Sequence, residues 1–147
     1  AKAVVGTFVI FYWGGAMIGR FVGSWLMQFL QPSKVLSVFA VGSISLIAIT
    51  LMSSGFVAMW SALAIGLFNS IMFPTIFTLS IEDLGDKKPQ GSGILCTAIV
   101  GGAIIPPLFG VLTDAGGFGL AFFLPMLCYF FILYFGWKLT QMHAETA

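Results

Sequence analysis

The stretch VIFYWGGAMIGRFVGSWLMQFL, residues 9–30, places a single arginine inside a long apolar run. A charged side chain at the centre of a lipid bilayer costs roughly 2.5–3.5 kcal/mol on insertion scales. Arg20 is therefore expected to face a polar interior rather than lipid. A polar interior among apolar helices predicts a cavity, or a path through a helical bundle.

The rest of the chain has the same apolar character. Of its 147 residues, 59% are hydrophobic and 7% are charged, whereas a soluble domain carries about 25% charged residues. Such a chain cannot cover a globular surface with polar groups, so we expect the lipid bilayer as its solvent and an all-α fold. With a net charge of +1 and no basic patch, no nucleic acid is expected as a partner.

Four polar breaks divide the chain into five apolar runs, each long enough to cross about 30 Å of hydrocarbon as a helix. The breaks are QPSK (31–34), SSG (53–55), EDLGDKKPQGSG (82–93) and DAGGFG (114–119). We expect a polytopic transmembrane helical bundle with spans at about 3–30, 35–53, 56–81, 92–113 and 120–139. Five spans leave four lysines on one side, which predicts a cytoplasmic C-terminus: Lys34, Lys87, Lys88 and Lys138.

The first span combines a packing face with a polar face. Small residues recur every four positions and allow close approach of a second helix: Gly15, Gly19 and Gly23. Polar residues recur with the same spacing on the adjacent face: Arg20, Ser24 and Gln28. Three roles stay open for Arg20: binding carbonyls of a broken neighbouring helix, contacting a translocated solute, or pairing with a carboxylate in a gate.

The third span, which contains GLFNSIMFPTIFTLSIEDLG (66–85), carries polar and helix-breaking residues at membrane depth. Pro74 removes one backbone hydrogen bond, and the freed carbonyl needs a partner or water. The Asn69 amide suits sugar hydroxyls, and the flat ring of Phe73 suits the C–H face of a pyranose. Structural roles are the alternatives: an interhelical hydrogen bond for Asn69 and packing for Phe73.

The fourth span is expected to be kinked or interrupted, as helices that line transporter cavities often are. Its breaking residues are Gly101, Gly102, Pro106 and Pro107. In the first span, Tyr12 and Trp13 are candidates for an aromatic wall of a sugar site or for an interface anchor.

The fifth span, by contrast, has no charge at depth and carries aromatic residues on every face. We expect it to be a lipid-facing support helix. Cys96 and Cys128 lie inside apolar runs, where we expect small buried hydrophobes rather than a disulfide or metal site.

No carboxylate and no histidine lies at mid-membrane, since the acids fall at the ends of the spans and His143 in the tail. An intramembrane enzyme needs a catalytic pair at depth, so no catalytic site, metal or cofactor is expected. A proton or sodium carrier needs a buried acid, which is then expected outside this chain. A five-span scaffold subunit would explain the packing glycines, but not the Arg, the Asn and the double proline together.

Four segments carry a resemblance to a known family: YWGGAMIGRFVGSWL (12–26), KVL (34–36), FNSIMFPTIFTLSIEDLG (68–85) and GGAIIPPLFGVLTDAGG (101–117). They resemble the C-terminal part of the fucose–galactose–glucose–proton symporters, a branch of the major facilitator superfamily. The resemblance covers nearly the whole chain and is closest to bacterial glucose/galactose transporters. It implies helices 8–12 of twelve, the C-terminal half of the fold without its first helix, in the bacterial inner membrane.

The resemblance implies a fragment of a secondary active sugar transporter that works by alternating access. The implied partners are a hexose, glucose or galactose, a coupling proton or sodium ion, and the missing N-terminal helices of the same transporter. Another sugar, L-fucose or N-acetylglucosamine, is the alternative substrate. The candidate substrate-binding residues are Asn69, Phe73, Tyr12, Trp13 and Arg20.

Two positions depart from the family pattern. Gln28 stands where the loop after the first span has an acid in the family, although Gly23, Leu26 and Lys34 fit. This departure puts the charge-relay role of the loop in doubt. Phe73 stands where the fucose permease has a tyrosine, which argues against fucose as the substrate.

Overall fold

The computed structural model describes residues 2–145, and this range is helical with no strand. The elements are α1 (Lys2–Leu26), α2 (Pro32–Met52), α3 (Phe56–Asn69), α4 (Met72–Ile81), the 3₁₀ helix η1 (Glu82–Lys87), α5 (Lys88–Ala98) and α6 (Gly101–Glu145). The predicted all-α class is confirmed. Two stretches are long and apolar enough to cross a membrane, by length and composition: Pro32–Met52 and the helical region within Phe56–Met142.

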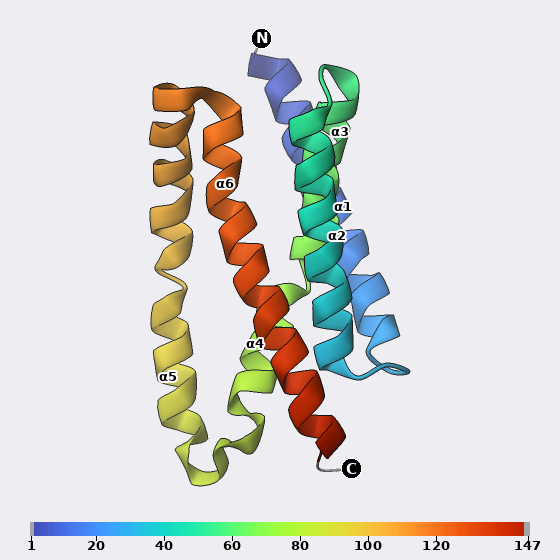
Figure 1. The fold of residues 1–147 in the computed structure, drawn as a ribbon, viewed down its shortest axis with the longest axis vertical. Helices are drawn as coiled ribbons and strands as arrows, with labels where there is room; N and C mark the ends of the chain where they lie inside the picture. The colour runs from blue at the N-terminus through green and yellow to red at the C-terminus, as the bar shows by residue number, and fades with distance from the viewer. Residues whose placement is uncertain (1, 146–147) are drawn as a thin grey trace.

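The helices run up and down along the long axis of the molecule (Figure 1). In that view α1, α2 and α3 form one group, while α5 and the first part of α6 rise on the other side. The second part of α6 then descends and crosses toward α2, against which it packs. The α1–α2 turn, η1 and the C-terminus lie at one end of the molecule, and the α2–α3 turn lies at the other. All four of the lysines named above therefore belong to segments at the same end.

The first helix is shorter than the predicted span to residue 30. It ends at Leu26, and residues 27–30 form a turn in which the Gln28 N–H bonds the Trp25 carbonyl at 3.2 Å. Pro32 is the first residue of α2. A proline fits a first helical position because it needs no N–H there, but it cannot continue a helix already under way. The chain must therefore turn before it.

The predicted third span is broken in its middle. α3 ends at Asn69 and α4 begins at Met72, with a turn at Ser70 and Ile71. Pro74 itself lies in the first turn of α4, where its missing N–H costs nothing. Its ring would clash with the carbonyl four residues earlier, that of Ser70, in a continuous helix. The break therefore falls before the proline rather than at it.

The predicted fourth span is also interrupted, between α5 and α6 at Ile99 and Val100. The Gly102 N–H bonds the Ile99 carbonyl at 2.8 Å in a tight three-residue turn. Pro106 and Pro107, four residues beyond Gly102 and Ala103, lie inside α6. The interruption lies more than one turn before the prolines, whose rings meet the carbonyls of Gly102 and Ala103 inside α6, so the prolines do not account for its position.

The last two predicted spans meet at Gly117. This glycine has φ 79° and ψ 177°, a conformation that is open essentially only to glycine. There α6 reverses direction, as Figure 1 shows at the top of the view. Phe109 and Phe122 stack edge to face across the reversal, with ring centroids 5.4 Å apart.

The core gathers around α2, and α5 contributes no buried residue to it. Val35, Leu36, Phe39, Ala40 and Ile47 of α2 are buried together with residues of the α3–α4 region and α6. The expectation that the last span is merely a lipid-facing support is wrong, because Ala121 and Tyr129 of α6 are buried. Cys96 and Cys128 are free and exposed, so the expectation that they are buried is also wrong.

Candidate functional site

The helices α1 and α3 approach each other closely where α1 crosses the end of α3. A Cβ added to Gly19 would lie 2.6 Å from Ser70 Oγ and 2.8 Å from the Leu67 carbonyl carbon, and closer still to the Leu67 oxygen. One turn further on, a Cβ on Gly23 would meet the Ile71 side chain at 3.0 Å. Glycine is therefore required at position 19 for this spacing, which we call the α1–α3 crossing.

Gly15 does not take part in this contact, although its spacing predicts that it should. A Cβ added there would meet nothing within 4 Å. Nearby on α1, the Tyr12 ring lies against Gly66 of the facing helix, α3. An aromatic ring between two helices keeps their backbones further apart, so the close approach is limited to Gly19 and Gly23.

The crossing coincides with the break between α3 and α4. The Ser70 hydroxyl donates to the Leu67 carbonyl at 2.9 Å, while Pro74 cannot donate to the Ser70 carbonyl. Below the break, the buried Thr75 hydroxyl donates to the Ile71 carbonyl at 2.7 Å. Irregular backbone at membrane depth is tolerated where it is buried in protein or lines a water-filled cavity.

Arg20 and Asn69 flank this crossing, one on each helix. Arg20 follows Gly19 directly, and Asn69 directly precedes Ser70; both side chains are exposed. Within the part of the chain whose side chains are described, neither makes a hydrogen bond or an ion pair. The structure thus places these two predicted residues next to the contacting residues of the crossing, one on each helix.

The polar residues that follow Arg20 at intervals of four, Ser24 in α1 and Gln28 in the turn after it, line surface hollows. Ser24 and Gln28 line an open hollow of about 620 Å³ together with Phe21, Val22 and Trp25. Ser24 also borders a smaller cavity of about 180 Å³ at the break, where Pro74, Thr75 and Thr78 are among the lining residues. Polar groups of α1 and α4 therefore lie on neighbouring hollows beside the crossing.

Tyr12 and Trp13 differ in burial and in what they contact on the facing helix. The Tyr12 ring is half-buried against Gly66, whereas Trp13 is 65% exposed. Their rings meet edge on, with centroids 6.2 Å apart. Adjacent residues on a helix do not share a face, so only Tyr12 lies between α1 and α3.

Phe73 lies at a separate hollow between α4 and the α5–α6 region. This hollow has a volume of about 380 Å³ and is lined by Phe73, Ile76, Phe77, Leu95, Ala98, Ile99 and Gly102. Phe73 is 51% exposed and packs beside Phe77, with ring centroids 6.1 Å apart. Of the predicted hinge residues Gly101, Gly102, Pro106 and Pro107, Gly102 alone borders this hollow.

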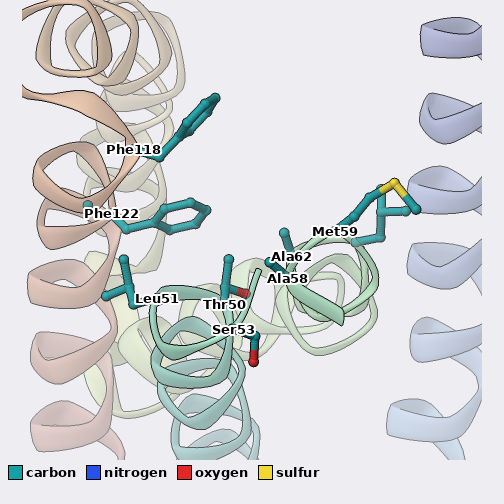
Figure 2. A pocket seen from close by; sticks show the side chains of 10 residues that line it. Thr50, Leu51, Ser53, Ala58, Met59, Ala62, Phe118 and Phe122 are labelled. Atoms are coloured by element: carbon teal, nitrogen blue, oxygen red, sulfur yellow. The ribbon is translucent and has the colours of Figure 1, made fainter. Parts of the chain in front are cut away.

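The largest of these hollows, about 680 Å³, lies elsewhere, near the α2–α3 turn and the reversal of α6. Figure 2 shows the Phe122 ring extending from α6 toward the side of Thr50 on α2 and of Ala58 and Ala62 on α3, with Phe118 above it. None of the predicted site residues lines it. Thr50, which lines this hollow, shares a hydrogen bond between its Oγ1 and Ser61 Oγ of α3 at 2.8 Å.

The chain is similar in sequence to proteins named as sugar transporters. The chain is 55% identical over 128 residues to a glucose/galactose transporter of Brucella abortus, covering 87% of this chain and 31% of that protein. It is 46% identical over 136 residues to a putative glucose/galactose transporter of Helicobacter pylori, covering 89% and 33%. It is 36% identical over 136 residues to the L-fucose-proton symporter of Escherichia coli, covering 92% and 30%. No protein-family model matches the chain.

The fold has a solved counterpart. The crystal structure of the major facilitator superfamily transporter FucP in the outward conformation matches with a TM-score of 0.89 and 31% identity. The match covers 95% of this chain and 34% of that one. The chain belongs to the major facilitator superfamily. It is thus an integral membrane protein, and it spans about a third of the length of the relatives it matches.

Sequence reasoning missed two polar residues in the interior of this major facilitator segment. Ser43 on α2 is fully buried, and Tyr129 on α6 is 8% exposed. Both looked unremarkable because they lie in apolar runs without a charge or a helix breaker. The available signal was their chemistry, since a hydroxyl placed in an apolar interior needs a polar neighbour.

Proposed function

We propose that the complete protein containing this chain is a secondary active sugar transporter, which moves glucose or galactose together with a proton by alternating access. The names of the relatives support this proposal, because the curated proteins at 55% and 46% identity are glucose/galactose transporters and the one at 36% is a proton symporter. In this proposal the chain supplies helices 8–12 of twelve, and helices from the rest of the protein complete the sugar site.

The observation that carries the proposal is the similarity to the named sugar transporters, and we assign sugar binding to the two polar side chains that flank the α1–α3 crossing, Arg20 and Asn69. A guanidinium and an amide beside a broken helix are costly in apolar surroundings unless a polar partner meets them. Arg20 and Asn69 are exposed and make no hydrogen bond within the described side chains. A sugar offers several hydroxyls that accept from a guanidinium and exchange hydrogen bonds with an amide.

The remaining candidates take supporting roles in this proposal. Tyr12, half-buried on the same side as the crossing, presents a phenol to the sugar. Phe73, next to Pro74 and the break, presents a flat ring from the neighbouring hollow, and the exposed Trp13 meets another helix of the complete protein or the membrane interface. Gly19, Gly23 and the interrupted α5–α6 region allow the close packing and bending that alternating access needs.

We further propose that the C-terminus faces the cytoplasm of the bacterial cell. The segments with Lys34, Lys87, Lys88 and Lys138 lie at one end of the molecule (Figure 1), and an excess of lysine marks the cytoplasmic side. A reporter that is active only in the cytoplasm, fused to the complete protein directly after the residue that is Ala147 of this chain, is expected to be active. Activity of a periplasm-specific reporter at that position instead would reverse the orientation.

The transport proposal is tested by uptake of labelled glucose into membrane vesicles that contain the complete protein. Uptake is expected to rise with an imposed inward proton gradient and to be blocked by unlabelled galactose. If L-fucose or N-acetylglucosamine blocked uptake and galactose did not, the sugar that blocks uptake would be assigned as the substrate. Absence of uptake of any of these sugars under proton and sodium gradients would refute a sugar transporter.

The proposed sugar-binding roles of Arg20 and Asn69 are tested in the same vesicles. Asn69→Ala is expected to raise the half-saturating sugar concentration about tenfold, the value of one lost hydrogen bond at the upper end of its range, with unchanged protein abundance. Arg20→Leu is expected to impair transport at equal abundance. Gln90→Ala, an exposed amide at the start of α5, is the control and should leave uptake unaltered. If Arg20→Leu lowered abundance alone, its role would be structural.

A further inference from the structure

An open hollow of about 400 Å³ lies where the second part of α6 packs on the first turns of α2. The two helices touch beside it at Gly136, where an added Cβ would lie 2.7 Å from Ser37 Oγ and 3.3 Å from the Ser33 carbonyl oxygen. Ser37 is small, and its hydroxyl already donates to the Ser33 carbonyl at 3.0 Å. The hollow is therefore bounded mainly by large side chains of α6: Phe130, Leu133, Tyr134 and Trp137.

The hollow lies apart from the other candidate sites. Its described lining residues come from α2 and α6 alone, so it is separate from the α1–α3 crossing and from the hollow at Phe73. Three of its rings are about half exposed, at 50%, 54% and 55%: Phe130, Tyr134 and Trp137. Exposed rings on a membrane-spanning helix are suited to contact with lipid chains or with another helix.

Two lysines continue the walls of this hollow toward one end of the molecule. Lys138 follows Tyr134 by four residues on α6, and Lys34 precedes Ser37 by three residues on α2, so each shares a helix face with a lining residue. Both lysines are exposed, and neither makes an ion pair among the described side chains. The α1–α2 turn and the C-terminus lie at this end (Figure 1). The apolar hollow therefore ends beside two positive charges.

This combination of residues is typical of the boundary between hydrocarbon and headgroups. Tryptophan and tyrosine are enriched there, and lysines near helix ends extend their ammonium groups toward the interface. Basic pockets between membrane helices bind anionic headgroups. A phospholipid with a net negative headgroup supplies a phosphate for the ammonium groups and an acyl chain for the rings. An apolar helix would supply no counter-charge, and a zwitterionic headgroup brings a cation of its own.

We propose that this hollow is a binding site for one anionic phospholipid. Lys34 and Lys138 pair with its phosphate, and the rings of Tyr134 and Trp137 lie along the first part of an acyl chain. The site adds a lipid ligand to the proposed sugar transporter. It does not depend on sugar transport, because none of the residues assigned to sugar lines it.

The test is quenching of tryptophan fluorescence by brominated lipid in vesicles that contain the complete protein. The signal of Trp137 is the difference between the unaltered protein and Trp137→Phe. Brominated phosphatidylglycerol, present as a small fraction of the vesicle lipid, is expected to quench this signal more strongly than the same fraction of brominated phosphatidylcholine. The ratio of the two apparent binding constants gives the preference for the anionic lipid.

Lys34→Gln and Lys138→Gln are each expected to lower this ratio about fivefold, a typical value for one lysine at a membrane surface. The matched controls are Lys87→Gln and Lys88→Gln, which remove the same charge from exposed positions at the same end of the molecule. They lie in η1 and at the start of α5, away from the hollow, and are expected to leave the ratio unaltered.

Three results would overturn the proposal. Equal quenching by the two brominated lipids would remove the preference for a negative headgroup. Absence of quenching by either lipid would show that another helix of the complete protein, or a second copy, covers Trp137. Loss of the preference in sodium phosphate, but not in sodium chloride of the same ionic strength, would assign the lysines to free phosphate. Sugar uptake does not enter these measurements, so failure of the transport proposal leaves their outcome intact.

Discussion

The α1–α3 crossing gives the sharpest test of the structure through Gly19→Ala in the complete protein. A methyl group at this position would meet backbone as well as a side chain, since the Leu67 carbonyl carbon would lie 2.8 Å away and Ser70 Oγ 2.6 Å away. Ordinary contact begins at 3.4 Å. The two helices would therefore have to separate by more than half an ångström. The matched control is Gly15→Ala, one turn earlier on the same helix, where the methyl group meets nothing within 4 Å.

The expected magnitude follows from two opposed terms. Replacing glycine by alanine in a helix interior is favourable by about 1 kcal/mol, and this term is common to both variants. Overpacking costs about 1–3 kcal/mol and applies at Gly19 alone. The difference between the two variants therefore isolates the packing term, and Gly19→Ala is expected to be less stable than Gly15→Ala by about 1–3 kcal/mol.

The assay is thermal unfolding of the purified protein in detergent, with glucose uptake in vesicles as a second readout. Gly19→Ala is expected to unfold a few degrees below Gly15→Ala and to transport more slowly, because the displaced helices carry Arg20 and Asn69. Equal unfolding temperatures and equal uptake for the two variants would refute the close crossing.

Three further changes probe other parts of the fold. Gly117→Ala is expected to destabilise the reversal of α6 by about 1–3 kcal/mol, because φ 79° with ψ 177° is strained for other residues; thermal unfolding measures this. Thr50→Val removes the 2.8 Å bond to Ser61 between α2 and α3 and is expected to cost about 0.6 kcal/mol, a typical value within a bilayer; chemical unfolding measures it. Gly66→Ala is expected to displace the Tyr12 ring and to raise the half-saturating glucose concentration with little change in unfolding temperature.

Each of these changes has an internal control. Gly119→Ala, two residues beyond the reversal with nothing within 4 Å, should be neutral or stabilising, and equal loss in both glycine variants would contradict the strain at position 117. Ser45→Ala leaves all interhelical bonds intact, so a loss equal to that of Thr50→Val would remove the α2–α3 bond as its cause. Gly93→Ala, in open space on α5, controls for Gly66→Ala.

Several features of the candidate site could be read from residue types alone. An arginine and an asparagine in apolar runs predict a polar interior whatever the packing, because the cost of desolvating them is set by their own chemistry. Pro74 and the double proline also predict helix interruptions from their own chemistry, because proline lacks an N–H and its ring clashes within a helix. The break near Pro74 falls one turn before that proline, because its ring obstructs the Ser70 carbonyl. The break at Ile99 and Val100 lies further upstream of the double proline.

Other features depend on which helix lies opposite, which no local pattern states. The repeat of Gly15, Gly19 and Gly23 is regular along α1, but the helices converge below Gly15, so only two of the three glycines are needed. Tyr12 and Trp13 are equivalent in the sequence, yet Gly66 across the interface admits the ring of Tyr12 and leaves Trp13 outside.

Composition and run length by themselves determined the lipid environment and the helical class, because backbone groups in hydrocarbon must bond within their own segment. The lysines and the breaks predicted the alternating direction of the runs. Only the tertiary structure decided that Arg20 and Asn69 flank the same helix crossing, that Phe73 lines a different hollow, and that Ser43 and Tyr129 are buried. These are relations between residues far apart in the chain, and they are fixed by how closely whole helices can approach, a property of both surfaces together.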